Sequence, residues 1–167
     1  MKRIRYYTVA AATAVVLACF VGPGIASASP TASEMCNTDQ VGQGLCAQAT
    51  GNKSNDYFKM EKKASSSLFT PTTRSGTAQM RLAGTNLCLT QDNGYAPNVV
   101  LNTCKGLARQ EWIPRFIPGG TFVEYSYQNE YTKNCLNDDY FLHELNAATC
   151  NDGADQIFFF PAFPAVD

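Results

Sequence analysis

Two stretches of the sequence share one spacing of cysteine and aromatic residues, and this repeat constrains the fold more than any other feature. Each stretch contains a Cys-Leu pair, a second cysteine and a Gln-x-aromatic triplet. The cysteines and closing aromatic residues are Cys88, Cys104 and Trp112 in one stretch and Cys135, Cys150 and Phe158 in the other. Counted from the first cysteine as position i, they stand at i+16 and i+24 in one stretch and at i+15 and i+23 in the other. A pattern that recurs in this way indicates one structural unit that is used more than once.

A weaker copy of the same pattern precedes these two. Phe69 stands at i+23 relative to Cys46, and Lys62 stands where the second cysteine would fall. The three copies occupy residues 43–75, 76–117 and 118–162, with approximate boundaries. Three similar units in one chain predict a closed structure with threefold symmetry.

The local pattern within the repeats favours short strands. Runs rich in Val, Leu, Phe and Tyr are separated by Gly, Asn, Asp and Pro, and no segment shows the apolar spacing of a helix. The expected strands are 78–83, 87–90, 98–103, 110–113, 121–127, 134–137, 143–147 and 156–160, with one more near Leu68-Phe69. We therefore predict an all-β domain, whose closure would leave no exposed sheet edges.

Residues at equivalent positions of the repeats are candidates for the structural core. They are Phe69, Gln110, Trp112, Gln156 and Phe158. Large aromatic side chains bury about 150–250 Å² each, so they usually serve packing before binding. We expect the three aromatic rings to meet in one core.

Residues 1–28 have the features of a secretory signal peptide. Three basic residues lie near the start of the chain, an apolar run extends from Val9 to Val21, and Ala26-Ser27-Ala28 is a small-residue cleavage site. We expect cleavage after Ala28 and secretion of the mature protein. An uncleaved membrane anchor and lipid attachment at Cys19 are the alternatives, but the apolar run is shorter than the about 20 residues of a spanning helix.

Six cysteines would remain after this cleavage. They are Cys36, Cys46, Cys88, Cys104, Cys135 and Cys150. An even number in an exported chain predicts three disulfides, because the compartment outside the cytosol is oxidising. Six thiols can pair in about 15 ways, and their spacing alone does not choose among them.

Charge and composition exclude several classes of function. The loss of three basic residues would reduce the 13 Lys and Arg to 10, against 14 Asp and Glu, so the mature chain has a formal charge of −4. Such a chain has no basic surface for nucleic acid. His143 is the single histidine and there is no Cys-x-x-Cys, so we expect no metal, no cofactor and no hydrolase site built around a histidine.

The Cys-Leu, second Cys and Gln-x-Trp elements resemble those of the ricin B-type lectin family over residues of about 43–162. The match is specific in the two later repeats, although Phe158 replaces the last Trp. The resemblance implies a β-trefoil over 43–167, with 29–42 as a preceding segment. It also implies disulfides Cys88–Cys104 and Cys135–Cys150, which leaves Cys36 to pair with Cys46. Carbohydrate is the implied ligand.

Members of this family that bind sugar use three residues in each repeat. These are an Asp after the first Cys, an aromatic residue before the second Cys, and an Asn before the Gln of Gln-x-Trp. The corresponding residues here are Thr90, Asn102 and Arg109 in the middle repeat, Asn137, Ala148 and Asp155 in the last, and Gln48 and Met60 in the first. No repeat keeps the three residues, so the resemblance in fold does not by itself carry over the ligand.

Polar and aromatic residues in two turns offer a relocated sugar site. They are Asp92, Tyr95 and Asn98 in the middle repeat, and Asp138, Asp139, Tyr140 and His143 in the last. Carboxylates would bind hydroxyl groups and a tyrosine ring would stack on the sugar. An ordinary polar turn explains the same residues, because turns favour Asp, Asn and Gly.

We therefore expect a secreted, monomeric, non-enzymatic carbohydrate-binding module with relocated or weakened sites and no membrane span. The alternative is a trefoil that recognises a secreted or cell-surface protein, for example as a toxin accessory subunit or an inhibitor. Tyrosines expected in exposed turns favour this alternative, because Tyr is common at protein interfaces. They are Tyr95, Tyr125, Tyr127, Tyr131 and Tyr140.

Overall fold

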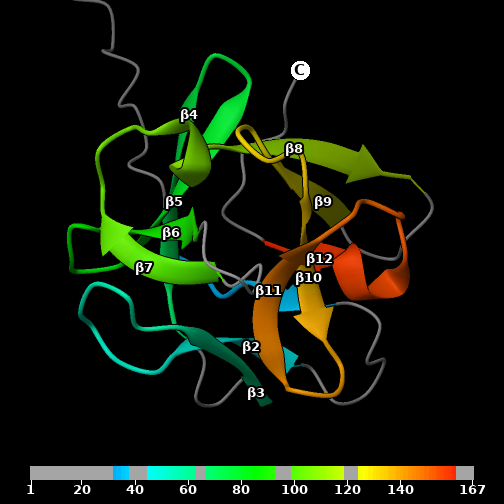
Figure 1. Ribbon diagram of the computed structural model, residues 1–167, viewed down its shortest axis with the longest axis horizontal. Coiled ribbons are helices and arrows are strands. Elements are labelled where there is room, and N and C mark those ends of the chain that lie inside the picture. The colour runs from blue at the N-terminus through cyan, green and yellow to red at the C-terminus, as the bar shows by residue number, and fades with distance from the viewer. Residues whose placement is uncertain (1–31, 38–44, 63–66, 93–98, 119–123, 161–167) are drawn as a thin grey trace, which may run out of the picture.

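The computed structural model describes residues 32–37, 45–62, 67–92, 99–118 and 124–160 (Figure 1). Within these ranges the chain forms twelve strands and two short 3-10 turns, with no α-helix. The strands are β1 (Cys36–Asn37), β2 (Leu45–Ala49), β3 (Phe58–Lys62), β4 (Phe69–Arg74), β5 (Thr77–Leu82), β6 (Leu87–Gln91), β7 (Val99–Thr103), β8 (Trp112–Ile117), β9 (Glu124–Asn129), β10 (Cys135–Asp139), β11 (Glu144–Ala148) and β12 (Phe158–Phe159). The turns are η2 (Ala108–Gln110) and η3 (Ala154–Gln156). The prediction of an all-β fold is confirmed.

Six of the strands form a closed barrel. Antiparallel pairing runs from β1 to β12, β9, β8, β5 and β4. The ring closes where Ser33, just before β1, bridges Phe69 at the start of β4, with backbone bonds of 2.9 and 2.8 Å. Because every barrel strand then has a neighbour on each side, the barrel has no open edge.

The other six strands form three hairpins: β2–β3, β6–β7 and β10–β11 (Figure 1). The hairpins also touch one another, through the pair Glu144 and Lys59 and through a bridge from Tyr57 to Val100. A six-stranded barrel with three hairpins, one for each repeat, is the β-trefoil that the family resemblance implies.

The aromatic residues of the repeats lie in the core. Phe69, Trp112 and Phe158 are fully buried, as are the amide side chains of Gln110 and Gln156. The Trp112 indole Nε1–H donates to the carbonyl oxygen of Leu89 at 3.2 Å, so its polar atom is satisfied inside the hairpin of its own repeat.

Three disulfides connect the strands. They join Cys36 to Cys46, Cys88 to Cys104 and Cys135 to Cys150. The first ties β1 to β2, and each of the others closes a loop of one later repeat. Each disulfide restricts the unfolded chain. In the chain-entropy account, loops of this length stabilise the folded state by about 3 kcal/mol per disulfide.

The N-terminal boundary differs from the sequence-based expectation. Residues 29–42 are expected to precede the trefoil, yet β1 supplies a barrel strand and Met35 is fully buried in the core. A two-residue strand carries almost no local signal, because its pairing with β12 joins residues more than 100 positions apart. The trefoil therefore begins before Cys36.

The first repeat contains strands that the pattern does not predict. β2 is made mostly of small and polar residues, and β3 alternates Phe58 and Met60 with charged residues. The two strands pair with each other over five residue pairs, so the hairpin, more than strand preference along β2, defines them. A second difference is that Gln110, expected in a strand, ends the 3-10 turn η2. Asn98 and residues 121–123 of the expected strands lie outside the described residues.

No helix in the described part of the chain is long and apolar enough to cross a membrane.

Candidate functional site

A cavity of about 320 Å³ lies in the middle repeat, beside the β6–β7 hairpin and η2. Its lining includes Thr90, Asn102 and Arg109, the three residues that occupy the sugar-binding positions of the family resemblance. Lys105 and Leu107 line it from the segment between β7 and η2. The fold therefore brings the three family positions together in one cavity although their residue types have changed.

Gln110 organises this cavity. Its amide nitrogen donates to the Thr90 hydroxyl at 3.1 Å and to the Thr103 carbonyl at 2.9 Å. Its amide oxygen accepts the backbone N–H of Lys105 at 2.8 Å. Thr90 in turn donates its hydroxyl to the carbonyl oxygen of Cys88 at 2.9 Å. Both side chains are almost fully buried, so their hydrogen bonds hold the wall of the cavity rather than a ligand.

The accessible polar groups of the cavity come from other residues. Asn102 and Arg109 are half-buried residues, and Lys105 is exposed. Within the described part of the chain, none of these three side-chain groups has a hydrogen bond or an ion pair. They are therefore available to a ligand.

Ser54 adds a hydroxyl from the first repeat. It lies in the connection between β2 and β3, which is fastened to β7 by two backbone bonds. The N–H of Asn55 donates to the Leu101 carbonyl at 2.7 Å, and the N–H of Leu101 donates to the Asp56 carbonyl at 2.8 Å. The cavity thus has contributions from two repeats.

The last repeat has the same local framework. Gln156 donates to the Asn137 side chain at 3.3 Å and to the Thr149 carbonyl at 3.0 Å, and it accepts the backbone N–H of Asn151 at 3.0 Å. These contacts match those of Gln110 one by one. Asp155 precedes Gln156, as Arg109 precedes Gln110 in the middle repeat. The two repeats therefore share a framework and carry opposite charges on it.

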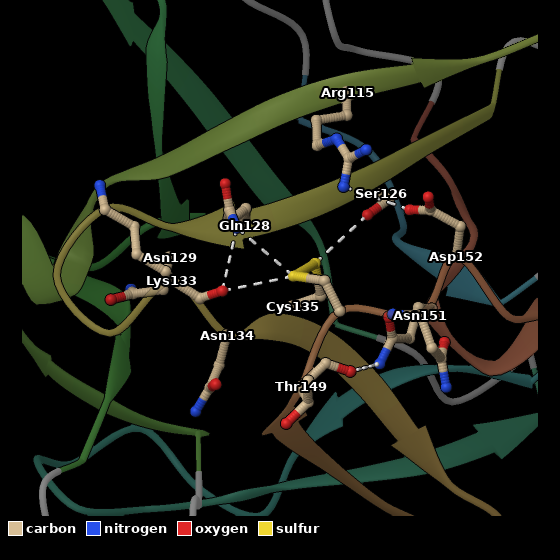
Figure 2. The surroundings of a disulfide bond; sticks show 12 residues. Arg115, Ser126, Gln128, Asn129, Lys133, Asn134, Cys135, Thr149, Asn151 and Asp152 are labelled. Carbon is tan, nitrogen blue, oxygen red and sulfur yellow. Dashed lines mark hydrogen bonds and ion pairs between the residues drawn. A yellow bond between two sulfur atoms is a disulfide. The ribbon is translucent and has the colours of Figure 1, made fainter.

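Figure 2 shows the disulfide of this last repeat and its surroundings. The Gln128 amide donates to the Lys133 carbonyl at 3.0 Å and to the Cys150 sulfur at 3.5 Å. Arg115 on β8 forms an ion pair with Asp152 at 3.2 Å, and both side chains are about half exposed. Asp152 has a positive φ of 54°, and Gly106, two positions after the matching cysteine of the middle repeat, has a φ of 62°.

The register of the first repeat corrects one position. Cys46 pairs with Glu61, as Cys88 pairs with Asn102 and Cys135 with Ala148. Glu61 therefore occupies the aromatic position of the family, and Met60 is a buried core residue. The loop between β2 and β3 differs in length from what a spacing-based alignment assumes, which displaces the match by one position.

The turn residues predicted as a relocated site are only partly assembled. Tyr95 and Asn98 lie outside the described residues, and Asp92 is exposed directly after β6. In the last repeat Tyr140 and His143 are exposed, with ring centroids 6.2 Å apart. Asp138, by contrast, is only 6% exposed within β10, which leaves little of its carboxylate accessible.

Asp139, rather than Asp138, organises that turn. Its carboxylate accepts the backbone N–H groups of Phe141 and Leu142 at 3.0 and 3.1 Å and the Asn146 amide at 3.2 Å. This is the local bonding of an ordinary Asp-initiated turn. These hydrogen bonds fix the tip of the β10–β11 hairpin, where Tyr140, Phe141 and Leu142 are exposed.

Two of the tyrosines expected in exposed turns are in the core. Tyr125 and Tyr127 are buried on β9, because this strand pairs with β8 and β12 inside the barrel. Tyr131 and Tyr140 are exposed, and Tyr95 is outside the described residues.

Sequence reasoning misses part of the cavity. Lys105 could be noticed in the sequence as a charged residue directly after Cys104. Leu107 and Ser54 have no feature in the sequence that would indicate a place at the cavity. The family spacing shows that Arg109 stands where sugar-binding members have an Asn. It gives no reason to expect that Arg109 itself binds a ligand. Its availability to a ligand is a property of the folded chain.

No protein-family model matches the sequence. No curated protein matches it either. Solved structures do match. ThreeFoil, a designed threefold-symmetric protein, has a TM-score of 0.64 and 10% identity, over 75% of this chain and 94% of ThreeFoil. A mosquitocidal holotoxin has a TM-score of 0.66 and 14% identity, over 77% of this chain and 17% of the toxin.

A lectin from Polyporus squamosus, solved with a sialylated epitope, has a TM-score of 0.59 and 12% identity, over 75% of this chain and 47% of the lectin. The chain thus spans nearly all of the designed protein and less than half of the toxin and the lectin. At these identities the similarity defines the fold: this chain is a β-trefoil, of the type found in lectins and toxins.

Proposed function

We propose that this protein is a secreted, non-enzymatic carbohydrate-binding module and that saccharide binds in the cavity of the middle repeat. The observation that carries the proposal is the accessible set of Asn102, Lys105 and Arg109 around a wall that Gln110 already holds. Polar side chains without internal partners, fixed around a cavity, suit a ligand rich in oxygen atoms. The sugar-binding lectin among the structural neighbours supports the same class of ligand.

Export and the absence of a catalytic role are parts of this proposal. Three disulfides support export, because such bonds persist in oxidising compartments. His143, the single histidine, lies in an exposed turn remote in sequence from the cavity residues, which supports binding without chemistry.

A glycan array probed with residues 29–167 tests the proposal. We expect reproducible binding that the Asn102→Ala variant loses and that the Asn86→Ala variant keeps, since Asn86 is exposed outside the cavity. Both variants are checked for an unchanged circular dichroism spectrum. Binding that is lost with Tyr140→Ala instead would place the site at the turn of the last repeat, and a folded protein that binds no glycan would contradict the proposed function.

Protein recognition is the second candidate, and the tip of the β10–β11 hairpin favours it. Phe141 is 90% exposed between the exposed Tyr140 and Leu142, and Asp139 holds the turn in place. Aromatic residues on a fixed tip are suited to a protein interface. This candidate predicts that a defined cell-surface protein binds the parent and the Asn102→Ala variant equally and does not bind Phe141→Ser.

A further inference from the structure

We infer that the saccharide bound in the middle-repeat cavity is acidic and carries a carboxylate or sulfate group. This inference rests on the proposed function, because it specifies the ligand class of the same cavity.

The charges around the cavity have one sign. Lys105 and Arg109 are its two ionised side chains, and no Asp or Glu is among the described residues that line it. The whole chain has a formal charge of −1, so this local excess of positive charge does not reflect the overall composition. Two unpaired cations beside a cavity attract an anionic ligand and favour it over a neutral one.

Hydrogen-bonding capacity points the same way. A neutral sugar presents hydroxyl groups that need acceptors, and binding sites commonly supply a carboxylate for them. Here the Gln110 oxygen is already occupied by the Lys105 N–H, and the Thr90 hydroxyl already accepts from Gln110. The Asn102 amide still offers one neutral acceptor oxygen, but no described lining residue supplies a carboxylate, and the two charged groups, an ammonium and a guanidinium, can only donate. A ligand with many acceptor oxygens and a negative charge matches these donors.

The position of Arg109 is fixed by the fold. Its backbone lies in η2, directly before the buried Gln110. The Asn129 amide donates to the Arg109 carbonyl oxygen at 3.0 Å and so attaches this turn to β9. Arg109 is half-buried on this anchored turn, so its charge is screened less by solvent, and pairing with a carboxylate or a sulfate is stronger there than on an open surface.

The last repeat shows that the fold does not require these cations. Its matching turn places Asp155 before Gln156 and Asn151 directly after Cys150, where the middle repeat has Arg109 and Lys105. The Asn37 amide donates to the Asp155 carbonyl oxygen at 3.1 Å, as Asn129 does to that of Arg109. Because the framework accepts an acidic residue at one of these positions and a neutral residue at the other, structural need does not account for the pair of cations in the middle repeat.

The test uses residues 29–167 and an array on which each neutral oligosaccharide is paired with its carboxylated and sulfated forms. The best set is then titrated by calorimetry at low and at high salt. We expect at least one acidic form to bind about tenfold or more tightly than its neutral parent, because one charge-assisted contact accounts for roughly that factor. We also expect this preference to decrease with added salt.

Variants locate the preference. The double substitution Lys105→Gln with Arg109→Gln should bring the acidic form to the affinity of its neutral parent. Arg81→Gln is the matched control, because Arg81 is an exposed cation on β5 that does not line the cavity. It should leave the preference unchanged. An acidic preference that survives the double substitution would overturn the inference, because the anion would then bind elsewhere.

The remaining outcomes separate the inference from the proposed function. Equal binding of neutral and acidic forms that is lost with Asn102→Ala overturns the inference and leaves the carbohydrate-binding module standing. A correctly folded protein that binds no oligosaccharide overturns both. Where only the carboxylated or only the sulfated form binds, that result supports the inference and identifies the acidic group.

Discussion

Tyr127 illustrates how the barrel determines the chemistry of single residues. Its ring is fully buried on β9, with centroids 6.1 Å from Tyr125 and 6.5 Å from Phe158. Burial, together with the charge of a nearby Tyr125, raises the pKa of the Tyr127 hydroxyl well above its ordinary value of 10.0. The neutral phenol is therefore the form that the folded protein retains.

We predict that the folded protein loses stability as the pH rises above about 10. In the unfolded chain Tyr127 ionises near its ordinary pKa of 10.0, whereas the folded chain keeps the proton. The free energy of unfolding should thus fall by up to about 1.4 kcal/mol per pH unit through this residue. Urea unfolding between pH 8 and 11 should show a shallower decrease for Tyr127→Phe. An unchanged slope in that variant would contradict the prediction, and Tyr131→Phe, at an exposed tyrosine, is the control.

At the scale of elements, the two 3-10 turns η2 and η3 are equivalent parts of the framework. Each ends in a buried glutamine that binds one backbone carbonyl, one backbone N–H and one side chain of its own hairpin. An asparagine from the barrel, Asn129 or Asn37, attaches each turn from the other side. The turns join the hairpins to the barrel, and η2 also places Arg109 at the cavity.

Comparing substitutions of the two glutamines distinguishes an effect on stability from an effect on saccharide binding. We predict that Gln110→Leu and Gln156→Leu each lower the free energy of unfolding by about 1–3 kcal/mol, since each removes the hydrogen bonds of a buried glutamine to its own hairpin. Urea unfolding measures this loss. Only Gln110→Leu should also weaken saccharide binding, because only η2 carries a cavity residue. Equal loss of binding in both variants would show that the effect is global.

At the scale of the whole molecule, the barrel depends on a strand from the N-terminal end of the described chain. β1 lies between β12 and β2, and Ser33 completes the ring by its bonds to Phe69. Met35 in the same segment is fully buried. The first and last repeats therefore meet through residues 33–37, and the closed barrel needs them.

We predict that a chain beginning at residue 38 loses cooperative unfolding. Without residues 33–37 the edges of β12 and β4 are exposed and the core lacks Met35. Near-ultraviolet circular dichroism during thermal unfolding measures the loss, relative to a chain that begins at residue 29. The double variant Cys36→Ser, Cys46→Ser keeps β1 without its disulfide and should still unfold cooperatively. A truncated chain with the same midpoint as the longer one would show that the segment is dispensable.

The sequence predicted the features that each repeat encodes locally. Short apolar runs between turn residues were sufficient for the all-β class, and the Cys-Leu and Gln-x-aromatic spacing was sufficient for the threefold arrangement and the buried positions of Trp112 and Phe158. These features recur in each copy because each hairpin and its closing turn are built from neighbouring residues. Periodicity therefore reports them without any long-range information.

The tertiary structure alone decided how distant segments meet. β1 belongs to the barrel only because β12 pairs with it, and Ser54 reaches the cavity only because its loop bonds to β7. The same holds for Lys105 and Arg109, which line one cavity with Ser54 of the first repeat only in the folded chain. Such contacts join residues from different repeats, so no local pattern of residue types records them, and they become defined only when the chain closes on itself.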